Sequence, residues 1–300
     1  MRIATFNVDN LDLPPRSEIS LDDRISILRP QLKRLRADIL CLQEINGQHL
    51  AAGGPRTLLA LDKLLEGTIY QSYARAVSAS SPGGGVADVH NLVTLSRWPI
   101  LNFQSIRNTL VPLLSYRPLT SIPPAAEPLK IAFERPILVA DIEAASGRVV
   151  TVINVHYRAP IAAPVPGQKE NASVWRSVSG WAEGYAIAAW KRTAQALETR
   201  LVIDGLLETD ASRFLIVAGD FNAEDHETPL KILIGAEEDT GNGRLAERTL
   251  VVLDRSISED RRFSVLYHGR AQMLDHILAS WQSLAHFRGI EAHNETLADE

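Results

Sequence analysis

Short apolar runs separated by polar residues constrain the fold of this chain more than any other feature. Each run is four to seven residues long and is bounded by polar, glycine or proline residues. The runs are rich in valine and isoleucine, which is typical of buried strands. They cover residues 3–6, 39–42, 92–95, 137–142, 149–155, 214–218 and 274–278.

Helical periodicity lies between some of these runs. In residues 22–36, apolar side chains recur at three- and four-residue spacings, which predicts an amphipathic helix. Residues 57–65 form a second candidate helix and residues 174–208 the longest one. Gly180 and Gly184 weaken the first half of the longest helix, because glycine has a low helix propensity.

The connections between the runs indicate the fold class. Residues 139–143, a Ser-Gly turn at 146–147 and residues 149–155 form the clearest predicted hairpin. Other runs are joined by helices, so we expect an α/β (α+β) chain whose mixed sheets are covered by helices. Two long loops, residues 80–88 and 111–128, are expected to border a functional site.

Composition excludes several classes of protein. Hydrophobic residues make up 45% of the 300 residues and charged residues 22%, which is typical of a globular chain. Cys41 is the sole cysteine, so an intrachain disulfide and a cysteine-rich zinc cluster are excluded. No apolar run approaches the roughly 20 residues of a membrane span, and no signal peptide is predicted, so we expect a cytoplasmic protein. The net charge of −5 argues against a broadly basic nucleic-acid surface.

Polar side chains with ligand chemistry follow the ends of the apolar runs. A single carboxylate in such a place is usually a turn or helix cap. Five such endings in one chain favour a site instead, because loops at strand ends converge over a rigid sheet. The residues concerned are Asn7, Asp9, Glu44, His156, Asp220, Asn222 and Asp275.

The residue types indicate the chemistry of this site. Carboxylate and amide oxygens suit Mg²⁺ or Mn²⁺, whereas a closed zinc site would need more cysteine or histidine. A hard cation beside His156 points to phosphate-ester hydrolysis. Arg135 and Arg158 are candidates for binding an anionic substrate, and we favour Arg158 because it lies two residues beyond His156. His90 and the other isolated histidines are expected to be surface or structural residues.

Six motifs, in order along the chain, resemble those of the endonuclease/exonuclease/phosphatase superfamily. Its members include pancreatic deoxyribonuclease, apurinic-site endonucleases, sphingomyelinases and inositol-polyphosphate phosphatases. The resemblance runs from residue 1 to about residue 280 and implies a four-layer αββα sandwich, two mixed β-sheets flanked by helices. Because the site residues run from Asn7 to Asp275, we expect a single domain over residues 1–300. The motifs are TFNVD at 5–9, LQE at 42–44, LSRWPI at 95–100, INVH at 153–156, GDFN at 219–222 and LDHIL at 274–278.

The resemblance also implies roles for the site residues. Asn7 and Glu44 would hold the metal, with Glu44 the principal ligand, and Asp9 matches a residue near the metal. His156 matches a position that contacts the scissile phosphate.

Three further residues match catalytic positions of the family. Asp220 would orient or deprotonate the attacking water, and Asn222 would hydrogen-bond a phosphate oxygen. Asp275 matches an aspartate that hydrogen-bonds a later histidine.

That later histidine belongs to a Ser-Asp-His-x-Pro motif in the family, and this sequence has no such motif. We therefore expect the chain to be truncated at its C-terminus, with the final strand missing. The alternatives are loss of a catalytic residue, or its replacement by His276 or His293.

The leading hypothesis is a divalent-metal-dependent phosphodiester hydrolase, specifically a nuclease that acts on DNA or RNA. One alternative is a phosphomonoesterase or lipid phosphodiesterase on the same scaffold. The other is a catalytically impaired module that binds phosphate esters, motivated by the absent motif. No protein partner is predicted.

Overall fold

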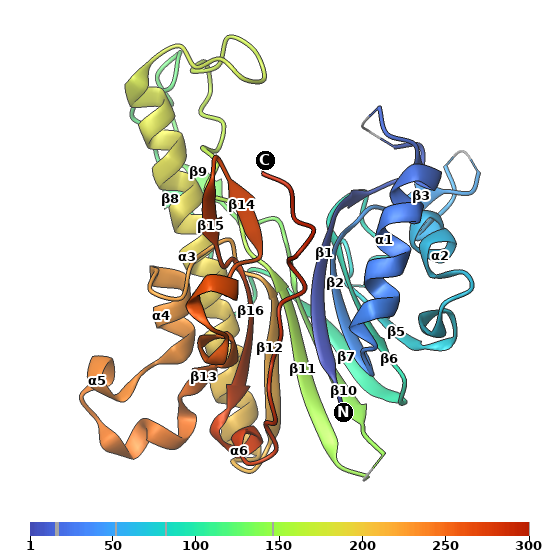
Figure 1. The fold of residues 1–300 in the computed structure, drawn as a ribbon. Helices are drawn as coiled ribbons and strands as arrows, with labels where there is room; N and C mark the ends of the chain where they lie inside the picture. The colour runs from blue at the N-terminus through green and yellow to red at the C-terminus, as the bar shows by residue number, and fades with distance from the viewer. Residues whose placement is uncertain (16–17, 52, 82, 146, 300) are drawn as a thin grey trace.

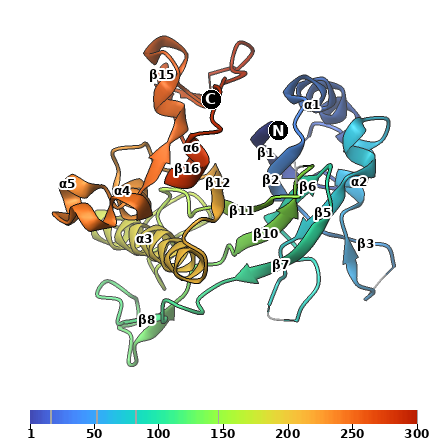
Figure 2. The same ribbon diagram turned by 90° about the horizontal axis from the view of Figure 1, so that it is seen from below.

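The computed structural model describes residues 1–15, 18–51, 53–81, 83–145 and 147–299. Two sheets lie face to face between two layers of helices, which Figure 1 shows from the side and Figure 2 from below. Pro82 of the predicted loop and Ser146 of the predicted turn lie outside the described residues.

The first sheet has four strands in the order β1-β2-β6-β5. Strands β1 and β2 are parallel, whereas β6 pairs antiparallel with both of its neighbours. Helices α1 and α2 cover its outer face (Figure 1). The bounds are β1 (Ile3–Leu11), α1 (Leu21–Leu35), β2 (Ile39–Ile45), α2 (Leu59–Leu65), β5 (Ala74–Val77) and β6 (Asn91–Ser96).

The second sheet has six strands in the order β13-β16-β12-β11-β10-β7. Only β11 and β12 are parallel neighbours among these described strands. Helices α3 and α4 cover its outer face. The bounds are β7 (Ile100–Ile106), β10 (Ile137–Glu143), β11 (Val149–His156), α3 (Val178–Thr209), β12 (Phe214–Asp220), α4 (Thr228–Ile234), β13 (Leu250–Val252) and β16 (Asp275–Ser280).

Shorter elements connect these layers. They are β3 (Gln48–His49), β4 (Arg56–Thr57), β8 (Leu114–Tyr116), β9 (Leu129–Ile131), α5 (Glu237–Thr240), β14 (Val265–Tyr267), β15 (Arg270–Gln272) and α6 (Trp281–Leu284). Short 3₁₀ turns cover Ile69–Ser72, Gly243–Arg248, Leu253–Ser256 and Glu259–Arg261. Within the described residues, none of the helices is long and apolar enough to cross a membrane.

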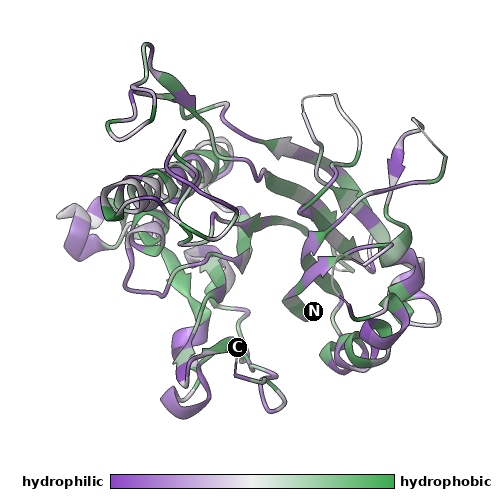
Figure 3. Ribbon diagram, turned by 90° about the horizontal axis from the view of Figure 1, so that it is seen from above, coloured by the Kyte–Doolittle hydropathy of each residue, from purple (hydrophilic) through white to green (hydrophobic). Residues whose placement is uncertain are grey.

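Strand alternation explains the layers. In β2, Leu40 and Leu42 pack under α1 and α2, whereas Ile39 and Cys41 pack between the sheets. Strand β12 divides its side chains between α3 and the space between the sheets in the same way. Figure 3 shows the resulting hydrophobic strands inside more polar helices and loops. Three buried clusters therefore fill the three spaces of a mixed α/β fold with two flanked sheets, which confirms the predicted fold class.

The predicted helices and hairpin are confirmed, with changed helix boundaries. Helix α2 begins at Leu59, two residues later than predicted. Helix α3 begins at Val178, four residues later than predicted, because the Ser177 side chain accepts from the Gly180 amide and caps it. Gly184 is needed for packing, since a Cβ there would lie 2.3 Å from the Ala163 carbonyl oxygen. The predicted loop 111–128 contains the short strand β8.

A buried polar pair joins the two sheets. Gln43 Nε2 donates to Asn154 Oδ1 at 2.8 Å, and both side chains are fully buried. Asn154 in turn donates to the Leu42 and Val93 carbonyls of the opposite sheet. Because buried polar groups are costly when unpaired, this contact fixes how the sheets sit against each other. Glu44, the next residue after Gln43, is thereby positioned near the carboxyl end of β2.

Candidate active site

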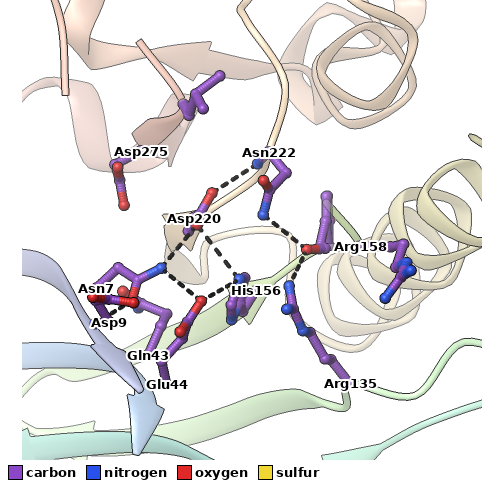
Figure 4. Close-up of polar contacts among 12 residues, drawn as sticks. Asn7, Asp9, Gln43, Glu44, Arg135, His156, Arg158, Asp220, Asn222 and Asp275 are labelled. Atoms are coloured by element: carbon purple, nitrogen blue, oxygen red, sulfur yellow. Dashed lines mark hydrogen bonds and ion pairs between the residues drawn. The ribbon is translucent and has the colours of Figure 1, made fainter. Parts of the chain in front are cut away.

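Strand register brings the predicted site residues together. Asn7 pairs with Gln43 across parallel β1 and β2, and His156 pairs with Asp220 across parallel β11 and β12. The amino end of antiparallel β16 places Asp275 opposite Asp220. Parallel strands end at the same sheet edge, so the side chains of both sheets meet there (Figure 4).

Asn7 links the carboxylates of the two sheets. Its Nδ2 donates to Glu44 Oε1 at 3.3 Å and to Asp220 Oδ2 at 3.0 Å. Its Oδ1 accepts from the Asp9 backbone N–H at 3.0 Å, and Glu44 Oε2 accepts from the Asn10 backbone N–H at 2.9 Å. The Asn7 amide nitrogen thus lies between two carboxylates, and the amide must rotate before its oxygen can ligate a cation.

His156 is buried next to the Glu44 and Asp220 carboxylates. Its Nε2 is 3.5 Å from Glu44 Oε1 and 3.4 Å from Asp220 Oδ2. Burial, together with the charges of Arg135 and His90, holds the pKa of His156 well below its usual value. The imidazole is therefore neutral at pH 7.

Asp220 and Asp275 form a buried acidic pair. Asp220 Oδ1 accepts from the Asn222 amide at 2.8 Å, and burial raises the pKa of Asp220. Asp275 is partly exposed as a residue, but its Oδ1 is buried and has no hydrogen-bond partner among the described residues. Burial and the charge of Asp220 raise the pKa of Asp275 to about 8.

Arg135 supplies positive charge at this site. Its Nη1 donates to the Tyr157 carbonyl at 2.6 Å. Burial lowers the pKa of Arg135 below its usual value, although the charges of Glu44 and Asp220 act against this shift. Arg158 is oriented differently, since its guanidinium points toward α3 and donates to the Ile161 carbonyl at 3.3 Å (Figure 4). The structure therefore brings Arg135 to the carboxylates, although the sequence favoured Arg158.

Asn222 and Asp9 occupy the border of the site. Asn222 Nδ2 donates to the Tyr157 carbonyl at 3.0 Å, while Asp9 lies on the exposed side of Asn7. Gly219 allows β12 to approach β11 here, because a Cβ at Gly219 would lie 2.0 Å from the Val155 carbonyl oxygen.

His276 and His293 do not join the cluster. His276 lies on the opposite face of β16 from Asp275, and both ring nitrogens are engaged, by Asp254 Oδ2 at 2.9 Å and the Ala223 carbonyl at 2.8 Å. His293 Nε2 lies 3.4 Å from Glu291. The geometry gives no support to either histidine as a replacement for the missing family motif.

His90 lies at the site although the sequence indicated a surface or structural residue. Its ring contacts that of His156, with centroids 6.1 Å apart and planes at 70°. Its backbone has a positive φ of 57°. Of the eight described non-glycine residues with positive φ, five lie here, namely Asp9, Asn10, Glu44, His90 and Asn222. Such clustering is typical of functional sites.

The donor set fits a hard divalent cation. Glu44, Asp220 and Asp275 are acidic and converge, and the unpartnered Oδ1 of Asp275 adds a buried acceptor. Arg135 is the cation that most strongly offsets the charge of Asp220, and the pKa values of both aspartates remain raised. An additional positive charge from a bound cation would therefore be stabilising.

Comparison with known proteins identifies the family. The sequence model described as "Endonuclease/Exonuclease/phosphatase family" matches residues 4–288. The chain belongs to the endonuclease/exonuclease/phosphatase family. This membership accounts for the six ordered motifs and indicates a phosphoesterase fold. No curated protein matches the sequence.

Solved structures share the fold of this family member. An endonuclease/exonuclease/phosphatase from Bacteroides vulgatus has 16% identity and a TM-score of 0.56, covering 93% of this chain and 87% of that one. A mannosyl-6-phosphatase from Bacteroides thetaiotaomicron has 13% identity and a TM-score of 0.56, with coverage of 93% and 85%. Humanized D. rerio TDP2 has 17% identity and a TM-score of 0.51, with coverage of 93% and 82%. At these identities the likeness concerns the fold alone.

Proposed function

We propose that this protein is a divalent-metal-dependent phosphodiester hydrolase that acts on DNA or RNA. The observation that carries the proposal is the convergence of Glu44 and Asp220 on one imidazole at the sheet edge, with His156 Nε2 3.5 Å from Glu44 Oε1 and 3.4 Å from Asp220 Oδ2. Glu44, Asn7 and Asp9 are the proposed residues for Mg²⁺ or Mn²⁺. When bound, the cation would offset the negative charge that develops on the phosphoryl oxygens.

Asp220 is the proposed base. The Asn222 backbone N–H donates to its Oδ1, and the Asn7 side-chain amide donates to its Oδ2, so the orientation of the carboxylate is fixed. Burial raises its pKa, which makes the carboxylate a stronger base than an exposed aspartate. Asp275, paired in register with Asp220, is proposed to hold a proton beside it.

Neutral and cationic donors are proposed to bind the phosphate. His156 is uncharged, so its ring N–H donates to a phosphate oxygen without a competing ion pair. Arg135 and Asn222 flank the same space and supply further donors. Arg158 remains a proposed phosphate ligand for a part of the substrate nearer α3.

A phosphomonoesterase or lipid phosphodiesterase is the second candidate function. A pocket of about 380 Å³ lies between α3 and the loop that contains β9, a volume suited to a small ligand. One relative of the same fold is a mannosyl-6-phosphatase. The pocket lining includes Lys130, Ile131, Arg158, Ala163, Ile187 and Lys191.

A substrate panel distinguishes the two candidates. Plasmid DNA, an RNA oligonucleotide, bis(p-nitrophenyl) phosphate, a phospholipid and p-nitrophenyl phosphate are each incubated with Mg²⁺ and with Mn²⁺. The proposal predicts nucleic-acid cleavage that weakens steeply as salt rises, because phosphate contacts release counterions. Efficient hydrolysis of the monoester or the lipid, with no cleavage of DNA or RNA, would replace the nuclease proposal with the second candidate.

A further inference from the structure

His90 gives this site a nitrogen donor that the oxygen-ligand account does not use. It lies directly before β6, whose first residue, Asn91, is the register partner of Ile45 at the end of β2. The Asn46 side chain accepts from the His90 backbone amide at 3.0 Å. His90 is therefore placed beside Glu44 by strand pairing and by a backbone contact, independently of its ring.

Side chains from the ends of β2 and β11 and from the residue before β6 converge here. One ligand atom each from Glu44, His90 and His156 lies within 4.8 Å of the others. His156 is 1% exposed, and its Nδ1 has no hydrogen-bond partner among the described residues. The Nε2 of the same ring lies 3.5 Å from Glu44 Oε1, so His156 turns a nitrogen toward the carboxylate of this cluster.

The donor types distinguish this cluster from the proposed magnesium site. Mg²⁺ prefers oxygen ligands and retains water, whereas two imidazoles with one carboxylate suit borderline transition-metal ions. The positive φ of His90 adds a cost that glycine would avoid at that position. A bound ion would offset this cost. Metal binding by the imidazole would then explain why position 90 holds histidine instead of glycine.

We propose that Glu44, His90 and His156 form a transition-metal site that binds Zn²⁺ or Co²⁺ through two imidazoles and one carboxylate. The proposal goes beyond hydrolysis and rests on the proposed function only through Glu44, which both cation sites share. Occupancy by Zn²⁺ withdraws His156 from phosphate binding. Because both sites use Glu44, Zn²⁺ competes with Mg²⁺ and inhibits the proposed Mg²⁺-supported reaction.

Metal binding tests this site without relying on activity. The full chain is stripped with a chelator, and Zn²⁺ and Co²⁺ affinities are measured by calorimetry. X-ray absorption at the zinc edge then counts the imidazole ligands. We expect one tight Zn²⁺ with two imidazoles, an affinity at least about tenfold weaker in His90→Asn, and the loss of one imidazole in that variant.

His268 offers a matched control. Its φ of 50° resembles that of His90, but it lies in the exposed turn between β14 and β15. His268→Asn should bind Zn²⁺ as wild type does, and Mg²⁺ affinity should be unchanged in both variants. Wild-type Zn²⁺ without imidazole ligands, or equal Zn²⁺ affinity in His90→Asn, would overturn the proposal.

A wild-type measurement covers the case in which His90→Asn does not fold. Added Co²⁺ should broaden the NMR signals of the His90 and His156 rings before those of other histidines. Broadening of other histidines first would also overturn the site. Because these readouts record binding, an inactive protein that binds Zn²⁺ in this way would refute the proposed hydrolase and leave the metal site standing.

Discussion

Asp220 and Asp275 are direct partners across antiparallel strands β12 and β16, so their carboxylates stand side by side on one face of the sheet. Like charges in this position repel each other. Burial and this repulsion raise the pKa of Asp275 to about 8, from an ordinary value of 3.8. At neutral pH and without a bound cation, the folded protein therefore retains a proton that the unfolded chain releases.

The contribution of Asp275 to the stability of the cation-free protein should fall as pH rises from about 4 to about 8, the window between its unfolded and folded pKa values. Asp275→Asn cannot ionise, so it should be more stable than wild type at pH 9 by about 2 kcal/mol, with a smaller difference at pH 5. Denaturant unfolding in EDTA measures the free energy of unfolding of wild type and Asp275→Asn at each pH. The exposed Asp260→Asn should show no such pH-dependent difference, and an equal gain for Asp275→Asn at both pH values would contradict the pKa assignment.

The Gln43–Asn154 contact between the sheets should contribute measurably to folding. Gln43→Met removes the amide and leaves the buried Asn154 Oδ1 without its donor, so we expect a loss of about 1–3 kcal/mol in the free energy of unfolding. A double-mutant cycle with Asn154→Leu should return part of that loss. Gln71→Met at an exposed position is the control. Fully additive effects of the two core substitutions would show that the contact is energetically irrelevant.

Glu198 on α3 should hold the start of the long loop in place. It is fully buried, and its carboxylate accepts from four successive backbone amides, those of Asn108, Thr109, Leu110 and Val111. Glu198→Gln presents a donor to some of these amides, which should cost about 1–3 kcal/mol and speed their hydrogen exchange. Glu208→Gln, exposed on the same helix, should leave exchange unchanged. Unchanged exchange in Glu198→Gln would refute this role.

The sequence predicted seven of the ten strands in the two large sheets and most of the site, because both depend on local pattern, whereas β5, β7 and β13 were not predicted. Asn7, Glu44, His156 and Asp220 each end an apolar run, and parallel pairing brings such endings to one edge. Alternation along β16 also separates Asp275 from His276, which follows from the two-residue strand period.

His90 and Arg135 were harder to predict because each precedes a strand. His90 comes before β6 and Arg135 before β10, and antiparallel pairing brings the amino end of one strand to the carboxyl end of its neighbour. Strand starts therefore contribute to the site as well as strand ends. Which strands pair in this way depends on contacts between distant parts of the chain, such as Gln43 with Asn154, and these leave no local pattern.

The metal requirement of phosphodiester hydrolysis, measured together with the effect of Glu44→Gln, tests the central claim most directly. The rate on bis(p-nitrophenyl) phosphate is determined with Mg²⁺, with EDTA and after Mg²⁺ is restored, for wild type, Glu44→Gln and the exposed control Glu66→Gln. The account predicts hydrolysis that EDTA abolishes and Mg²⁺ restores, with kcat/KM lower by about 100-fold or more in Glu44→Gln and unchanged in Glu66→Gln. Hydrolysis that persists in EDTA, or that Glu44→Gln leaves intact, would contradict it.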